Sequence, residues 1–526
     1  MKRRSLLGWA AASLASCSRE GPAEWRGGWV GAEGTRGHRL RAAGMPLPVA
    51  AVARRAQVLV IGGGIAGLAA ARQLAQSGLD DVHLLELEDQ PGGNSRGHAM
   101  AGMRCPLGAH YLPLPGPQAH EVSELLQALG LARWELGRMV YDERHLCHSP
   151  QERLFIDGAW AEGLLPPAAP GSGTLAQYRR FAQRVRQAQR ALGFALPTHR
   201  ARWTPGHDAL DRMSFVQWLQ REGLHDARLR WYLDYCCRDD YGAGPQQVSA
   251  WAGLHYFASR HGFHAPGDEE AEREPVLTWP EGNAWLAQRL AAPLAGRLHA
   301  ARTVLRVEEG RHEVRVLAWD EALGRAEAWL ARQVVLAVPL FVAARLLAAP
   351  PPALREAARL QRHAPWLVAN LQIDEPLLDR PNGAPPSWDN VVFGADARAL
   401  GYVDAMHQHT RAHPGPTVLT VYWALPLSQR RALWEQPWQH WAQQVVADLA
   451  QVHPDLPAKL RRAELMRYGH GMSIPLPGLR GSAALQALRR PQGRLHFAHA
   501  DLAGYSVFEE AYTAGVESAR AIVAPR

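Results

Sequence analysis

The spacing of hydrophobic positions changes several times along the chain and predicts alternating strands and helices. Residues 57–61 (QVLVI) form an apolar run of the kind found in a buried strand. A glycine-rich turn follows, and residues 68–76 are good helix formers. A second apolar run covers Val82 to Leu85 and ends in Glu86. This order of strand, turn, helix and strand is typical of an α/β fold.

The rest of the chain divides into stretches with different periods. Residues 119–275 have mostly helical spacing, strands return over 276–345, and residues 346–485 mix both. The expected helices are 174–195, 215–231, 439–452 and 508–523, and the expected strands are 303–307, 313–318, 334–338, 366–373, 418–423 and a short run from Leu495. A chain of 526 residues is long for one core, so we expect two closely connected domains.

The first residues have the pattern of an export address. Arg3-Arg4 precedes a short apolar run and resembles a twin-arginine signal. Leu14-Ala15-Ser16-Cys17 resembles a lipobox, which implies that Cys17 is lipidated on the periplasmic side of a bacterial membrane. The alternative is an ordinary cleaved signal with an incidental Cys17. Residues 18–55 are predicted to be a tether, although the aromatic stretch 25–30 suggests docking on the folded body.

Composition excludes several function classes. The net charge is +8, but the excess consists of scattered arginines without a basic stripe, so we expect no nucleic-acid partner. The five cysteines have no metal-ligand spacing, and we expect no metal and no disulfide framework. We interpret the pair Cys236-Cys237 as two buried apolar residues rather than a redox centre. No segment after the signal is apolar over about eighteen residues, so membrane contact is expected only through a lipid anchor.

The strongest motif is Gly62-x-Gly64-x-x-Gly67. In a dinucleotide-binding turn, the first glycine permits the tight turn, the second admits a pyrophosphate, and the third lets the helix pack against the strand. The N–H groups of Ile65 and Ala66 at the helix start would face the phosphates. Glu86 follows at about the spacing expected of an acid that binds a ribose.

Further motifs resemble the FAD-dependent amine oxidases, phytoene desaturases and protoporphyrinogen oxidases. The resemblance lies in a glycine pair soon after the acid, a Gly-Ala element from Gly108, a middle strand that contacts adenine, and a C-terminal strand that ends in an acid before a helix. The residues it assigns to FAD are Gly92, Gly93, Asn94, Arg96, Gly108, Ala109, His110, Tyr111, Val304, Asp501 and Phe508. Asn94 replaces the usual arginine, for which Arg96 substitutes.

This resemblance implies a Rossmann-type FAD-binding domain built from residues 56–118, 276–345 and 486–526. An α+β substrate domain would then consist of residues 119–275 and 346–485. No second Gly-x-Gly-x-x-Gly motif is present, so a separate NAD(P)H site is not expected.

The resemblance is less informative about catalysis. Many amine oxidases of this family place a lysine near the flavin, but the only lysines here are Lys2 and Lys459. Counting from Val338-Pro339 puts Arg345 near that position, where it could hold water or an anion, or simply be a surface cation. His470 and Tyr505 are the other catalytic candidates, with structural hydrogen bonding as the alternative.

We therefore expect an amine-oxidase-like enzyme that transfers a hydride from a small organic molecule to FAD. Oxygen or another acceptor would re-oxidise the flavin. Two alternatives remain open: a desaturase or isomerase of a lipophilic substrate, and a lipoprotein that binds FAD but serves a non-catalytic partner role. Residues 239–242, which begin with Asp239-Asp240, could form a helix cap, a loop or a substrate contact, with capping as the default.

Overall fold

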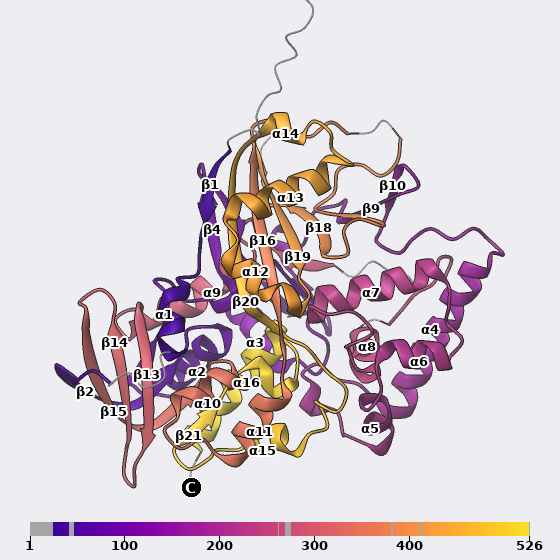
Figure 1. Cartoon of the computed structure of the whole chain (residues 1–526). Coiled ribbons are helices and arrows are strands. Elements are labelled where there is room, and N and C mark those ends of the chain that lie inside the picture. Colours follow the sequence, from indigo (N-terminus) through magenta and orange to yellow (C-terminus); the bar gives the residue numbers. More distant parts are fainter. Residues whose placement is uncertain are drawn as a thin grey trace, which may run out of the picture.

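A computed structural model describes residues 25–41, 47–260, 262–268, 275–379, 382–410 and 413–524. The predicted export signal and Cys17 lie outside these residues. Figure 1 shows two sheets. One includes β13 to β15, and the larger one includes β16 and β19, with the helices α4 to α8 gathered to one side. The chain is therefore an α/β molecule of two joined parts.

The first sheet unites distant parts of the sequence. Its strands in the described chain are β12 (Leu298–His299), β3 (Val82–Leu85), β2 (Val52–Ile61), β15 (Arg325–Leu336), β14 (Val314–Asp320) and β13 (Arg302–Glu309), with β21 (Leu495–Phe497) also paired to β15. Strand β2 runs parallel to β3 and to β15, and β21 runs parallel to β15. The predicted Rossmann-type fold, assembled from three chain segments, is confirmed.

Helices pack on both faces of this sheet. On one face lie α2 (Ile65–Gln76), α16 (Phe508–Val523) and α3 (His120–Ala128). On the other lie α10 (Leu340–Leu346), α11 (Pro352–Leu360) and α15 (Ala483–Leu488). Helices α3 and α11 were predicted to belong to the substrate domain. That prediction was wrong because a helical period shows which face of a helix is buried but not which sheet buries it.

The second sheet forms the centre of the substrate domain. Its strands in the described chain are β1 (Arg26–Trp29), β20 (Leu460–Ser473), β16 (His363–Ile373), β19 (Thr417–Ala424), β18 (Ala399–Asp404), β17 (Asp389–Val392), β9 (Glu152–Ile156) and β10 (Ala159–Glu162), in that order. Helix α13 (Trp438–Ala450) buries Trp441 and Val445 against β16 and β19. Helices α12 (Arg430–Glu435) and α14 (Leu456–Lys459) flank it (Figure 1).

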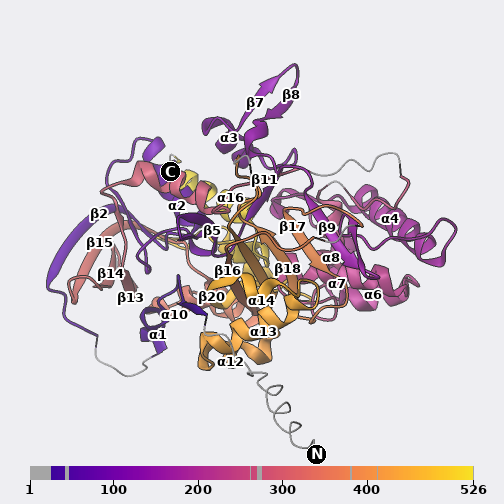
Figure 2. The same ribbon diagram turned by 90° about the horizontal axis from the view of Figure 1, so that it is seen from above.

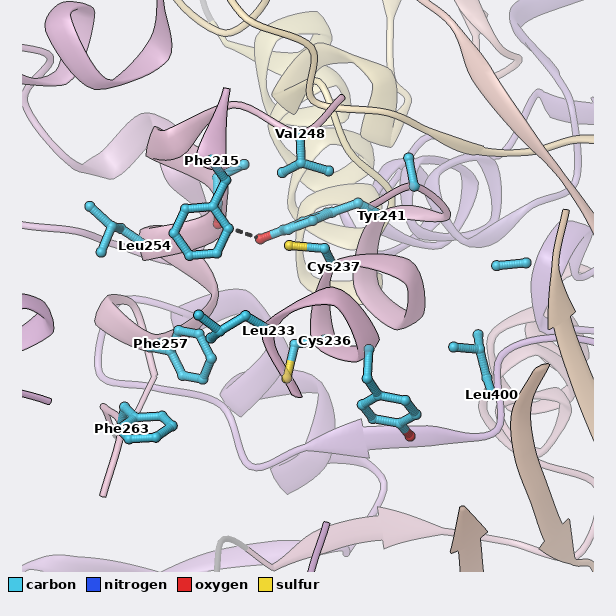
Figure 3. Close-up of a cluster of buried hydrophobic side chains, with 14 of the residues drawn as sticks. Phe215, Leu233, Cys236, Cys237, Tyr241, Val248, Leu254, Phe257, Phe263 and Leu400 are labelled. Carbon is cyan, nitrogen blue, oxygen red and sulfur yellow. Dashed lines mark hydrogen bonds between the residues drawn. The ribbon is translucent and has the colours of Figure 1, made fainter. Parts of the chain in front are cut away.

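The remaining helices enclose an aromatic core. They are α4 (Gly173–Leu192), α5 (Pro205–Asp211), α6 (Phe215–Arg221), α7 (Ala227–Tyr241) and α8 (Ala250–Ala258). Figure 3 shows Cys236 and Cys237 of α7 among apolar side chains, where Tyr241 donates a hydrogen bond to the carbonyl of Ala252 at 2.9 Å. The four cysteines in the described part of the chain have free thiols. Cys236 and Cys237 are therefore part of the apolar core, as interpreted from the sequence.

One local prediction in this region was wrong, and one was right but incomplete. The expected helix over 215–231 is two helices, because Gly223 takes a left-handed φ of +64° and Asp226 caps the start of α7. The stretch 119–275 also contains strands: β9 and β10, and the hairpin of β7 (Ala132–Glu135) and β8 (Arg138–Tyr141), which projects from the body in Figure 2.

The predicted tether is partly folded structure. Residues 26–29 are strand β1, which pairs in parallel with β20, and β2 begins at Val52 rather than after residue 55. A short helix, α1 (Gly34–His38), lies between them. The aromatic stretch 25–30 thus docks on the body, while the boundary at residue 55 was wrong.

The described residues contain neither a membrane-spanning helix nor a metal-binding cluster. No helix is long and apolar enough to cross a membrane. No group of three or more His, Cys, Asp or Glu side chains could hold a metal ion.

Candidate active site

One cavity of about 490 Å³ extends between the two parts of the molecule. The first sheet contributes the turn between β2 and α2, the end of β3, and the start of β13. The second contributes Trp366 and Val368 of β16, Tyr422 of β19, and Tyr468 of β20. Because both parts build its walls, a ligand in this cavity would contact both.

The glycines of the first motif form an open cradle at this cavity. Gly62 has a φ of +102°, and a Cβ there would meet the carbonyl oxygen of Ala337 at 2.4 Å. A Cβ on Gly67 would lie 1.8 Å from the carbonyl oxygen of Gly62, so Gly67 serves helix packing and does not line the cavity. A Cβ on Gly64 would meet no atom nearer than 3.9 Å. The free space at Gly64 and the adjacent N-terminus of α2 fit a pyrophosphate.

The second glycine pair lies against the first motif. The N–H of Gly92 donates to the carbonyl of Gly63 at 2.8 Å, and Gly93 adopts a φ of +56°. Asn94 also lines the cavity. Arg96, in contrast, points away from it: its guanidinium donates to the carbonyls of Gly93 and Gly31, both at 3.1 Å. The predicted direct contact between Arg96 and FAD is therefore not observed, because these backbone carbonyls hold the side chain.

Glu86 is fixed at the end of β3. One carboxylate oxygen accepts from the N–H of Gly63 at 2.6 Å, and the other accepts from the N–H of Glu88 at 2.8 Å. Burial raises the pKa of Glu86, although both backbone hydrogen bonds oppose the shift. Glu86 and the predicted adenine contact Val304 both line the cavity, so this is the end at which the adenosine of FAD is expected, here called the adenosine end.

The C-terminal motif contributes in two ways. Phe508 and Glu509 at the start of α16 line the cavity, so the positive end of the helix faces the ligand space. Burial raises the pKa of Glu509 to about 7. Asp501 does not reach the cavity, contrary to the prediction. It is fully buried and accepts hydrogen bonds from the N–H of Leu340 at 2.9 Å and from His363 at 3.0 Å.

Aromatic rings form the wall at the opposite end of the cavity. Gly108, Ala109, His110 and Tyr111 line it as predicted. The imidazole of His110 stacks on Tyr422 with ring centroids 4.4 Å apart, and Tyr422 donates to the carbonyl of Gly108 at 3.0 Å. Burial lowers the pKa of His110 to about 3, so this ring is neutral near neutral pH.

A buried acid joins this aromatic wall. Asp239 of α7 lines the cavity and accepts a hydrogen bond from the hydroxyl of Tyr111 at 3.4 Å. Burial, assisted by the neighbouring charge of Asp240, raises the pKa of Asp239 to about 7. Asp240 itself is paired with Arg260 at 3.0 Å. Asp239 is therefore not a helix cap, because Gly242 ends α7, and it lies where a ligand in the cavity could contact it.

The three catalytic candidates have different outcomes. His470 lines the cavity, with its ring centroid 4.8 Å from that of Phe341 and 6.3 Å from that of His363. Arg345 is exposed on α10 and does not reach the cavity. Tyr505 is buried in the aromatic core, where it donates to Glu510 at 3.3 Å. The roles proposed for Arg345 and Tyr505 were therefore wrong.

Sequence reasoning missed several cavity residues. Trp366 and Tyr422 lie in mostly apolar strands that are buried along almost their whole length, so their residue types predict only a core. Glu509 was missed because nothing in the sequence distinguishes it from its neighbour Glu510, which instead accepts a hydrogen bond from the N–H of Thr198 at 2.6 Å. Lys459, the one lysine in the described chain, pairs with Asp455 at 2.8 Å and does not line the cavity.

Comparisons with known proteins agree with this geometry. The model of the flavin-containing amine oxidoreductase family matches residues 65–523. A Mycobacterium tuberculosis protein named as a flavin-containing monoamine oxidase, AofH, is 28% identical over 289 residues, which span 54% of this chain and only 56% of that relative. Polyamine oxidase 7 of Oryza sativa subsp. japonica is 34% identical over 110 residues, 20% of this chain and 23% of that protein.

Solved structures share the fold. Putrescine oxidase bound to putrescine superposes with a TM-score of 0.67 at 18% identity, over 90% of this chain and 99% of that one. Cyclohexylamine oxidase from Brevibacterium oxydans gives a TM-score of 0.66 at 18% identity, over 89% and 98%. A fatty acid isomerase from P. acnes gives 0.59 at 17%, over 88% and 97%.

The glycine cradle, the anchored acid at the end of β3 and the helix start at α16 together fit FAD, and the family match, which begins at residue 65, covers the second glycine pair, the acid and the helix start. The cavity is the candidate FAD site, and the chain belongs to the family of flavin-containing amine oxidoreductases.

Proposed function

We propose that the chain is an FAD-dependent oxidoreductase that oxidises a small amine. When bound, FAD would accept a hydride from the carbon next to nitrogen after the ammonium group has lost a proton, which leaves an iminium ion. The single observation that carries the proposal is the wall of His110, Tyr111, Tyr422 and Asp239, which continues the cavity beyond the glycine cradle. The family and the amine oxidases that share the fold support it.

The wall suits a ligand that arrives as a cation. Aromatic faces attract ammonium groups, and a neutral His110 does not repel them. The Tyr422 hydroxyl is already engaged with the carbonyl of Gly108, which orients its ring. When ionised, Asp239 supplies the opposite charge, while the neighbouring cation Arg260 is neutralised by Asp240. These residues would bind and orient the amine before its oxidation.

Asp239 also favours an amine substrate over a lipophilic one. A fatty acid isomerase shares the fold, so the fold alone also permits a lipophilic substrate. A purely hydrocarbon ligand would leave Asp239 buried without a charged partner, which is costly. We therefore favour an amine over a polyene or a fatty acid. Oxygen or another external acceptor would re-oxidise the flavin.

The test is reduction of the bound flavin without oxygen. The purified holoprotein would be mixed anaerobically with putrescine, cyclohexylamine and benzylamine, and separately with unsaturated fatty acids and a carotenoid. We expect an amine to bleach the visible flavin absorbance and the lipids to leave it unchanged. Bleaching by lipids alone would support the desaturase or isomerase. Bleaching by dithionite but by none of these compounds would support a non-catalytic flavin lipoprotein.

We also propose that the protein is exported and lipid-anchored on the periplasmic side. The support is the Arg3-Arg4 pair and the sequence 14–17 that ends in Cys17. Cys17→Ala should move the protein from the membrane pellet to the soluble periplasm, and replacing Arg3 and Arg4 with lysines should keep it in the cytoplasm. Membrane association that survives Cys17→Ala would argue against the lipid anchor.

A further inference from the structure

The residues before the family match form an arm that reaches the FAD site. This N-terminal arm, residues 25–40, precedes the matched residues 65–523. It begins as β1 on the edge of β20, where a Cβ on Gly27 would lie 1.8 Å from the carbonyl oxygen of Ala463. The N–H of Val30 donates to the carbonyl of Leu465 at 2.9 Å. The arm is thereby fixed to the substrate domain.

After β1 the arm crosses to the first domain. Gly31 turns the chain with a φ of +86°, and its carbonyl accepts from Arg96 at 3.1 Å. The same guanidinium donates to the carbonyl of Gly93 at 3.1 Å. The arm and the second glycine loop of the FAD site therefore share one cation, which accounts for the position of Arg96 away from the cavity.

Helix α1 and the residue that follows it, Arg39, then contact two loops of the first domain, one on each side of the adenosine end. Arg36 donates to the carbonyl of Leu87 at 3.1 Å and pairs with Asp89 at 2.8 Å, in the loop that follows Glu86. On the other side, Arg39 pairs with Glu321 at 2.9 Å, in the turn after β14. Figure 1 shows α1 between the two sheets.

Two arm residues line the cavity itself. Gly37 and Leu40 are part of its wall, together with Leu87, Val304 and Leu346. Leu40 is partly buried and packs against the apolar cluster that contains Val304 and Leu346. An apolar side chain beside the predicted adenine contact would cover the ring of a bound adenine.

We propose that the N-terminal arm is a clamp on the adenosine end of FAD, and that tight retention of the cofactor depends on it. The clamp rests on the assignment of the cavity as the FAD site, and it adds a binding element that lies outside the family match. Leu40 would contact the adenine, and Arg36 and Arg39 would hold α1 against the two flanking loops. FAD bound beneath the arm could leave only after α1 had moved.

The test compares the release of FAD from full-length variants. The double variant Leu40→Ala with Arg36→Ala removes the apolar cover and one attachment. The matched control is Leu323→Ala with Arg55→Ala, which removes the same residue types from side chains that are 59% and 77% exposed. The readouts are the rate at which FAD fluorescence appears after dilution and the dissociation constant from equilibrium dialysis, with circular dichroism to verify folding.

We expect the arm variant to release FAD about ten-fold faster than the wild type, since the loss of apolar contacts acts mainly on dissociation. The control and the volume-conserving Leu40→Met should release it at the wild-type rate. Equal rates in the arm variant and the control would overturn the clamp while leaving amine oxidation intact. A wild-type protein that binds no FAD would overturn both the clamp and the proposed function.

Discussion

At Gly64 the missing side chain is itself the functional feature. A Cβ there would project into open space, whereas one on Gly62 or Gly67 would collide with backbone oxygens at 2.4 and 1.8 Å. Gly64 is thus the one glycine of the motif whose substitution the apoprotein can accommodate. A loss of FAD at this position can therefore be separated from a loss of folding.

We expect Gly64→Val to yield folded protein that purifies without flavin, because its side chain would occupy the pyrophosphate space. The measurement is the ratio of flavin to protein absorbance after purification. Gly173→Val is the control, since Gly173 is an exposed residue at the start of α4 with no atom near its Cβ position. Full flavin content in Gly64→Val would show that the phosphate loop has been misplaced.

Asp239 determines the expected pH dependence. Its carboxyl has a pKa of about 7, so it is largely neutral below that pH and charged above it. We expect Asp239→Asn to raise the KM for an amine by about ten-fold above pH 7, where the wild type offers a charge and the variant does not. Below pH 7 the two KM values should converge, because the wild-type carboxyl is then also neutral.

The control is Asp234→Asn on the same helix, whose carboxylate pairs with Arg238 at 2.7 Å and does not line the cavity. It should keep the wild-type KM at every pH. A KM ratio between Asp239→Asn and the wild type that stays constant with pH would mean that Asp239 does not pair with the substrate.

Site residues could be predicted from the sequence where they lie close together along the chain. Gly62, Gly64 and Glu86 belong to one strand–turn–helix–strand unit, so their spacing along the chain reports their spacing in space. Arg345 was placed by counting residues from Val338-Pro339. A count along the chain does not show which face of α10 a residue occupies, and Arg345 lies on the exposed face. Trp366 and Asp239 line the same cavity because the end of α7 lies against β16, where a Cβ on Gly242 would be 2.4 Å from that of Ala364, and no local pattern records this contact.

Among the elements, the contact between α16 and α2 brings the C-terminal motif to the N-terminal one. A Cβ on Gly515 would lie 2.1 Å from the carbonyl oxygen of Ala66, so the two helices touch along their backbones. Strand and helix limits in this region were predicted closely, including α16, because β21 and α16 keep a regular period. The helix pair itself could not be predicted, since Gly515 and Ala66 lie near opposite ends of the sequence.

We expect Gly515→Leu to lower the free energy of unfolding by about 1–3 kcal/mol, the usual effect of overpacking, and to weaken FAD binding through the displaced α16. Ala521→Leu places the same side chain on the exposed face of the same helix and should change the free energy of unfolding by no more than about 0.5 kcal/mol. Urea unfolding followed by circular dichroism measures both. Equal stabilities would mean that the helices can separate at little cost.

For the whole molecule, one ligand would connect four regions that are distant in sequence. The cavity wall includes Gly64 from the first segment, Val304 from the second, Phe508 from the third and Leu40 from the arm. Folding of the FAD domain and binding of FAD should therefore be strongly linked. Hydrogen exchange can test this linkage, because local opening exposes the amides of each region separately.

Adding FAD to the apoprotein should raise the free energy of unfolding by about 1.4 kcal/mol for each ten-fold increase in free FAD above the dissociation constant. Gly64→Val should show no such increase. In hydrogen exchange, FAD should protect amides around Glu86, Val304 and Phe508 together, because each borders the same cavity and none can open without exposing the ligand. Protection confined to the glycine turn would mean that the three segments do not close on a single cofactor, even though their strands share one sheet.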